Sequence, residues 1–150
     1  MKISRQFFNA ISGFAVLSIL LFCSGLIADA FAMDVMVICN KSVPESSLTK
    51  SELRNIFLGK KQEWSTGDSI IPVTLKKGEA HKAFCKIYLI KSPSQFIAYW
   101  KKMLFTGKGM IPKSFDNEKE MVDFIATTKG AIGYVSAGQT HDHVKVLQIY

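Results

Sequence analysis

Four segments rich in apolar residues predict β-strands, and the first of them is expected to be buried. Residues 34–40 contain Val35-Met36-Val37-Ile38 without a polar interruption, which is typical of a strand covered on both faces. Pro72 lacks a backbone N–H, so we expect it near a strand start or at a sheet edge. Three further strands are predicted by similar runs at residues 70–75, 131–135 and 144–147.

Apolar positions at helical spacing predict four helices between these strands. Thr49 with Glu52, and Ser92 with Gln95, form capping boxes in which each side chain satisfies a free amide of the first turn. The four helices are expected to begin after Thr49, Gly78, Ser92 and Asn117, and glycines end the first, third and fourth. Strands that alternate with helices predict an α/β fold with a mainly parallel sheet and helices on both faces.

The N-terminal residues have the pattern of a secretory signal peptide. Lys2 and Arg5 precede an apolar run at 11–21, and Ala30-Phe31-Ala32 supplies a small-x-small cleavage pattern. The run is shorter than the roughly 20 residues of a membrane-spanning helix, which disfavours an uncleaved anchor. We therefore predict a signal peptide at 1–32, cleavage after Ala32 and a periplasmic domain at 33–150.

The charge of the chain is compatible with an anionic ligand or surface. The net charge is +7, and residues 33–150 carry +6 once Lys2, Arg5 and Asp29 are removed. Arg54 is the only arginine after the predicted cleavage point, so we expect no nucleic-acid binding. An anionic ligand, an anionic membrane face and an ordinary solvated surface remain three alternatives for this charge.

Two cysteines, Cys39 and Cys85, follow the predicted signal peptide. An exported protein permits a disulfide between them. Both residues also lie in apolar segments, where free thiols are commonly buried. The sequence leaves these two alternatives open.

Three sequence blocks resemble the phosphate-type substrate-binding proteins of ABC transporters. They are residues 53–60 (LRNIFLGK) followed by Trp64 and Ile71-Pro72-Val73, residues 130–135 (GAIGYV), and Tyr99-Trp100 with 105–109 (FTGKG) and Pro112. The last block is similar to a short, single-lobe branch of that superfamily. The resemblance implies a type II periplasmic-binding-protein fold, here as a single lobe.

The resemblance also exposes two departures from the family pattern. The full binding proteins close two lobes on their ligand, whereas residues 33–150 have the length of one lobe. Phosphate binders carry an Arg and a Ser-Gly-Thr turn after the strand that corresponds to 70–75. This chain has Lys76-Lys77-Gly78-Glu79 there, without the hydroxyl residues and with an added negative charge.

Ligands of open α/β sheets bind beyond the carboxyl ends of the strands, so the residues that follow the strands are the candidates. Lys76, Lys77, Gly78 and His81 surround a helix start, whose free amides favour an anion. Asn40 and Ser42, which follow the first strand, and Ser136, which follows the third, are further candidates for the same edge, although loop capping and turn formation are the roles that we favour for them.

The sequence contains no recognisable nucleophile with a base, so we predict that the protein is not an enzyme. His141-Asp142-His143 is the one candidate metal cluster, and since no further ligands accompany it we expect no metal and no cofactor.

Two functions follow from these observations. The first is an exported solute-binding protein that takes phosphate or a similar oxyanion for an ABC transporter. The alternative is an interaction module that contacts a membrane or a periplasmic partner, such as a transporter or a sensor. A homodimer that rebuilds a two-lobed cleft is a further candidate assembly.

Overall fold

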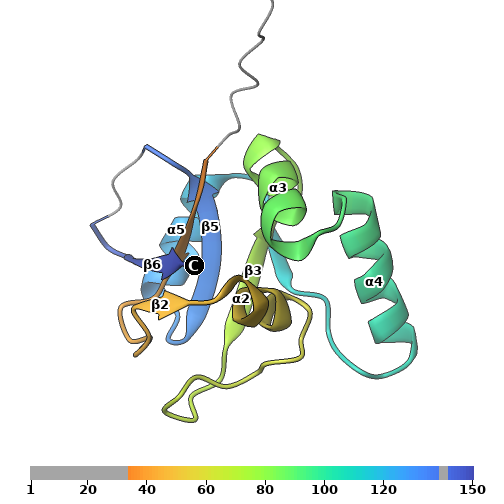
Figure 1. Ribbon diagram of the computed structural model, residues 1–150, viewed down its shortest axis with the longest axis horizontal. Helices are drawn as coiled ribbons and strands as arrows, with labels where there is room; N and C mark the ends of the chain where they lie inside the picture. The colour runs from red at the N-terminus through yellow and green to blue at the C-terminus, as the bar shows by residue number, and fades with distance from the viewer. Residues whose placement is uncertain (1–33, 139–141) are drawn as a thin grey trace, which may run out of the picture. The chain divides into compact units, whose positions relative to one another are not determined.

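A computed structural model describes residues 34–138 and 142–150, and the strands in these ranges form one six-stranded sheet (Figure 1). The strand order is β2-β6-β1-β5-β3-β4. The predicted signal peptide and His141 lie outside the described residues. The strands are β1 (Val35–Cys39), β2 (Ser47–Leu48), β3 (Ile71–Leu75), β4 (Lys113–Phe115), β5 (Ala131–Ser136) and β6 (Lys145–Ile149).

The sheet is mixed, with a parallel majority. Three of its five described neighbouring pairs are parallel, whereas β1 runs antiparallel to both β5 and β6. We call the end of the sheet where β3, β4 and β5 finish the carboxyl edge, and the opposite end the amino edge. Because β1 runs the other way, it starts at the carboxyl edge beside Ser136 and ends at the amino edge.

The helices begin where the capping residues predict. Both capping boxes are present, and the Asn117 side chain accepts the Glu120 N–H. One segment differs from the prediction, because the second helix changes to π-helical geometry and ends at Ile90 with a φ of 54°. The helices are α2 (Lys50–Phe57), α3 (Glu79–Phe84), the π-helical η1 (Cys85–Leu89), α4 (Pro93–Phe105) and α5 (Glu118–Thr127).

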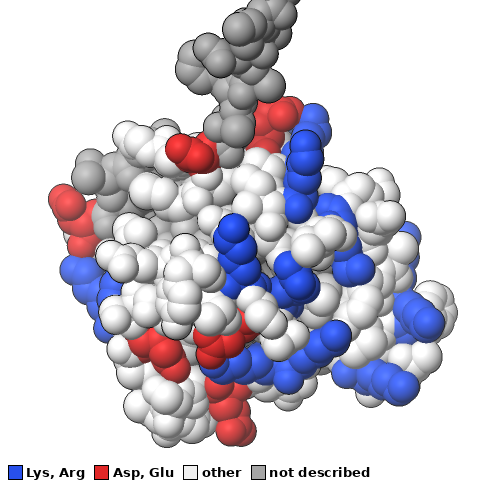
Figure 2. Space-filling model, viewed as in Figure 1, with Lys and Arg blue, Asp and Glu red and all other residues white. Residues whose placement is uncertain are grey.

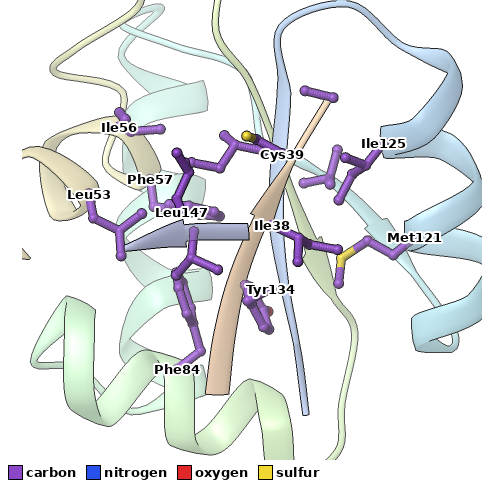
Figure 3. Close-up of a cluster of buried hydrophobic side chains, with 14 of the residues drawn as sticks. Ile38, Cys39, Leu53, Ile56, Phe57, Phe84, Met121, Ile125, Tyr134 and Leu147 are labelled. Carbon is purple, nitrogen blue, oxygen red and sulfur yellow. The ribbon is translucent and has the colours of Figure 1, made fainter. Parts of the chain in front are cut away.

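Helices cover both faces of the sheet, as predicted. On one face, an added Cβ at Gly133 would meet Ile125 and Met121 of α5. The next residue of β5, Tyr134, points the other way and stacks on Phe84 of α3. Figure 3 shows this division, with Met121 and Ile125 on one side of the strands and the side chains of α2 and α3 on the other.

The hydrophobic core lies within the described residues. Its largest fully buried side chains include Tyr134 and Ile38 of the sheet, Phe57 and Phe84 of the helices on one face, and Met121 of α5 on the other face. One buried cluster thus joins the described sheet and its helices. In the described ranges, no helix has both the length and the apolar character needed to cross a bilayer.

Two strands were missed from the sequence, and the place of one proline was predicted correctly. The strands β2 and β4 have two and three residues, too few to produce a periodic pattern. Pro72 is the second residue of β3, and β4 pairs only with the residues after it. The missing N–H of Pro72 thus leaves the pairing of β3 with β4 intact.

Candidate functional site

The carboxyl edge brings together four of the residues predicted from the sequence. Three of them, Lys77, Gly78 and Ser136, line a pocket of about 200 Å³. The fourth, Lys76, lines a separate cavity and directly follows β3, where its N–H donates to the Phe115 carbonyl at 2.9 Å. The backbone of Gly78 has a φ of 108°, so this turn into α3 needs the freedom of glycine.

Asn40 and Ser42 do not face the carboxyl edge, in agreement with the capping and turn-forming roles favoured from the sequence. Both residues follow β1, and because β1 runs antiparallel to β5 they lie at the amino edge. The buried Asn40 amide donates to the carbonyls of Ile125 at 2.7 Å and Ala126 at 3.0 Å. These carbonyls belong to the last turn of α5, which has no helical donors of its own. Asn40 is therefore a capping residue for α5.

Ser136 binds a carboxylate of its own chain. One oxygen of Glu118, at the start of α5, accepts the Ser136 N–H at 3.1 Å and the Ser136 hydroxyl at 2.6 Å. Two donors at the carboxyl edge thus converge on an anionic oxygen. The sequence marked the helix start at Asn117 but gave no indication that it would lie at this edge, since β4 was not foreseen.

Further carboxylates neutralise part of the positive charge here. Asp116 pairs with Lys76 at 2.9 Å, and Glu79 pairs with Lys82 at 2.6 Å. These side chains are largely exposed, so each pair contributes little to stability. These carboxylates affect ligand binding more than they affect stability. Glu79, Asp116 and Glu118 all line the pocket, and their negative charges oppose the binding of an anion there.

His81, the remaining predicted site residue, turns away from this pocket and into the protein. Only 2% of its surface is exposed. It lines a separate cavity of about 170 Å³ between β3, β4 and α4, together with Thr74, Phe96 and Ser114. His81 therefore does not contact an anion held at Lys77 and Ser136.

A short hydrogen-bond network fixes the protonation of His81. The phenol oxygen of Tyr134 accepts the Leu75 N–H at 3.1 Å and lies 2.6 Å from His81 Nδ1. Every group in this network is satisfied when Tyr134 donates its proton to Nδ1, an assignment that leaves the imidazole neutral with its proton on Nε2. Burial lowers the pKa of His81, in agreement with a neutral ring.

The buried imidazole predicts a loss of stability in mild acid. The folded-state pKa lies below the unfolded value of about 6.5, so the unfolded chain binds more protons below that pH. The free energy of unfolding should be greatest above pH 6.5 and fall between pH 7.5 and 5, as measured by urea denaturation. Cys85 and Tyr134 stay neutral throughout, because burial raises the pKa of both.

The His81→Asn variant is the control for this pH effect. Its amide oxygen can accept the Tyr134 proton, but the side chain does not titrate. We expect a shallower decline in its free energy of unfolding over the same interval. An identical decline in both proteins would show that His81 is not the responsible group.

The two cysteines are free in the structure. Burial raises the pKa of Cys39 to about 11 and that of Cys85 to about 12, so neither is a thiolate near neutral pH. In the described part of the chain, no three His, Cys, Asp or Glu side chains group as metal ligands. Because His141 is outside that part, the absence of a metal stays a prediction.

Solved structures of other proteins share the architecture of this chain. No family model matches the chain, and no curated protein matches it either. An ABC-type phosphate transport receptor from Vibrio cholerae aligns with 78% of this chain at a TM-score of 0.54 and 16% identity. PstS from Borrelia burgdorferi aligns with 78% at a TM-score of 0.60 and 12% identity.

The chain spans less than half of these proteins, 46% of the Vibrio receptor and 47% of the Borrelia protein. At such identities the comparison concerns architecture, and the arrangement of strands and helices agrees with the resemblance found in the sequence. The chain is thus an α/β protein with the type II periplasmic-binding-protein fold, in a span that corresponds to one part of a phosphate-type substrate-binding protein.

Proposed function

We propose that the protein is an exported solute-binding protein whose carboxyl edge takes phosphate or a similar oxyanion, for delivery to an ABC transporter. The observation that carries this proposal is the pair of Ser136 donors that converge on one oxygen of Glu118. A carboxylate oxygen and a phosphate oxygen accept the same hydrogen bonds. Exposed Lys77 and Gly78 lie beside this position and supply charge and backbone access.

We expect this site to bind a free oxyanion weakly. A small, strongly hydrated anion needs donors on all sides to replace its lost water, and one lobe offers donors on one side only. Glu118 occupies the Ser136 donors, and Glu79 and Asp116 add repulsion. The dissociation constant of the monomer for phosphate should therefore be millimolar or weaker, about −4 kcal/mol or less in magnitude.

Calorimetry of residues 33–150 with phosphate and with sulfate tests this site. Removing the competing carboxylate by Glu118→Ala should tighten binding about tenfold, because an anionic group that lines the pocket and accepts from Ser136 is gone. Asp123→Ala is the matched control. It makes the same charge change on α5 at a carboxylate that pairs with Lys119 and does not line the pocket, so its effect should stay below twofold.

A double lysine variant should change the affinity for phosphate in the opposite direction. Lys76→Ala with Lys77→Ala should weaken binding, and more strongly at low salt, where screening is least. If phosphate affinity is the same in the Glu118 variant, the lysine variant and the unaltered chain, the carboxyl edge is not an oxyanion site. Micromolar binding by the unaltered monomer would refute the expectation of weak binding.

An interaction module is the second candidate function, and an exposed apolar surface on α4 favours it. Leu104 is 52% exposed, and Phe105 beside it is 89% exposed. Exposed apolar side chains that cluster commonly mark a contact surface. A homodimer stays a prediction, as does the absence of enzyme activity, of a cofactor and of nucleic-acid binding.

A further inference from the structure

The positive charge of this protein is concentrated in one segment. Residues 80–115 contain seven lysines and no acidic residue, whereas the rest of residues 33–150 has ten basic and eleven acidic residues. The whole surplus of charge after the predicted cleavage point thus belongs to the segment that forms most of α3, η1, α4 and β4. In Figure 2 the visible surface over α4 is blue and white, without red.

The same segment exposes large apolar side chains at the end of α4 and in the loop after it. Phe105 and Met110 are 89% and 83% exposed. Ile97, Lys101 and Leu104 lie on one exposed flank of the helix, at spacings of four and three residues. We define the α4 surface by five apolar residues and three lysines: Ile97, Leu104, Phe105, Met110, Ile111, Lys101, Lys102 and Lys108.

The opposite side of α4 fixes the helix to the domain. The Trp100 ring is buried, and its N–H donates to the Phe57 carbonyl at 3.2 Å. The Tyr99 hydroxyl donates to the Leu58 carbonyl at 2.7 Å. Because these bonds hold α4 to the end of α2, the apolar residues of the α4 surface cannot turn inward without breaking them.

We propose that the α4 surface is a membrane-binding site that docks the protein onto a bilayer containing anionic lipid. Phe105 and Met110 protrude from the domain, and an interfacial bilayer region accepts protruding apolar side chains without a preformed pocket. Lys101, Lys102 and Lys108 would then lie at the level of the lipid phosphates, while their stems cover apolar surface. An acidic protein partner would need a pocket that matches the Phe105 and Met110 side chains. A bilayer needs no such pocket, so we favour the bilayer.

This site is independent of the carboxyl edge, since it shares no residue with the pocket at Lys77, Gly78 and Ser136. A protein with both the α4 surface and the anion site would expose the anion site to solution while it is bound to a membrane surface. Failure of oxyanion binding therefore leaves the docking proposal intact, and the reverse also holds.

Vesicle co-sedimentation of residues 33–150 tests the proposal, because these residues contain the complete described core and lack the predicted signal peptide. At low salt we expect binding to vesicles with 30% phosphatidylglycerol and none to pure phosphatidylcholine vesicles. Phe105→Ser with Met110→Ser, and separately Lys101→Glu with Lys102→Glu, should each lower the partition coefficient at least tenfold.

Matched variants elsewhere on the surface are the controls. Lys41→Glu with Lys50→Glu makes the same change of net charge, and Val146→Ser with Tyr150→Ser removes exposed apolar side chains from the region of β6. Each control should change the partition coefficient less than twofold. Circular dichroism of every variant establishes that it is folded.

Three outcomes would overturn the proposal. These are absence of binding to the anionic vesicles, equal losses in the α4-surface variants and their controls, and a dimer in solution that the Phe105 and Met110 replacements dissociate. The last outcome would assign the α4 surface to a second copy of the chain. A Phe105→Trp variant allows insertion of this side chain to be measured directly. Brominated lipids should quench the tryptophan fluorescence if the side chain enters the bilayer.

Discussion

Tyr134→Ala is expected to lower the free energy of unfolding by about 3–5 kcal/mol, the usual cost of truncating a large buried aromatic side chain. The Tyr134 side chain is fully buried, and its ring stacks on Phe84 with the centroids 3.8 Å apart. Truncation also leaves the Leu75 N–H and His81 Nδ1 without their partner. Since domains of this size commonly have 5–15 kcal/mol of stability, the variant should be marginally folded.

The contribution of the hydroxyl group can be separated from that of the ring. Tyr134→Phe keeps the stacking and removes both hydrogen bonds, so we expect a loss of about 1–3 kcal/mol. Tyr150→Phe removes a hydroxyl from a side chain that is 72% exposed and should be neutral. Urea denaturation at pH 7.5 measures all three variants. A Tyr134→Phe variant as stable as the unaltered protein would contradict the proposed network.

Gly130→Ala should destabilise the protein by about 3 kcal/mol or more, through two effects that add. Gly130 has a φ of 75°, a conformation that costs a residue with a Cβ roughly 1–2 kcal/mol. The added Cβ would also collide with the backbone carbonyl oxygen of Ser69, which cannot move aside as a flexible side chain could. The Gly130 carbonyl accepts the Ile71 N–H and the Trp64 ring N–H, so movement here would disturb the start of β3.

Gly67→Ala is the matched control for this prediction. Gly67 has a similar φ of 83°, but an added Cβ there would meet no atom within 4 Å. Its loss of stability should be limited to the same backbone cost of roughly 1–2 kcal/mol. Equal losses in the two variants, measured by thermal and urea unfolding, would contradict the predicted collision at Ser69.

The local structure of this protein could be predicted from its sequence because local interactions determine it. Thr49 with Glu52 and Ser92 with Gln95 begin their helices through bonds between residues three positions apart, and both were found as expected. The runs at 34–40 and 131–135 became largely buried strands for a similar reason, since a continuous apolar segment is typical of a strand covered on both faces, whereas Val146 of β6 stays 51% exposed. The π-helical turn at η1 was missed because no residue pattern distinguishes it from a regular helix.

The candidate site could be predicted only in part, because its assembly depends on strand direction. Lys76, Lys77, Gly78 and Ser136 share an edge since β3 and β5 are parallel, which the alternation of strands and helices already indicated. Asn40 was a candidate for the carboxyl edge but lies at the amino edge. The sequence did not show this, because the antiparallel direction of β1 results from long-range pairing with β5 and β6.

The sequence by itself determined four of the strands, the starts of the helices and the class of fold, since the local patterns behind them depend on neighbours a few positions away. Only the tertiary structure decided that Glu118 binds the Ser136 donors, that His81 turns inward to Tyr134, and that the α4 surface stays exposed. Each of these contacts or exposures depends on how elements distant in sequence pack together. The pattern along one helix can show that Leu104 is apolar, but the packing of α4 against the rest of the domain decides whether it is covered.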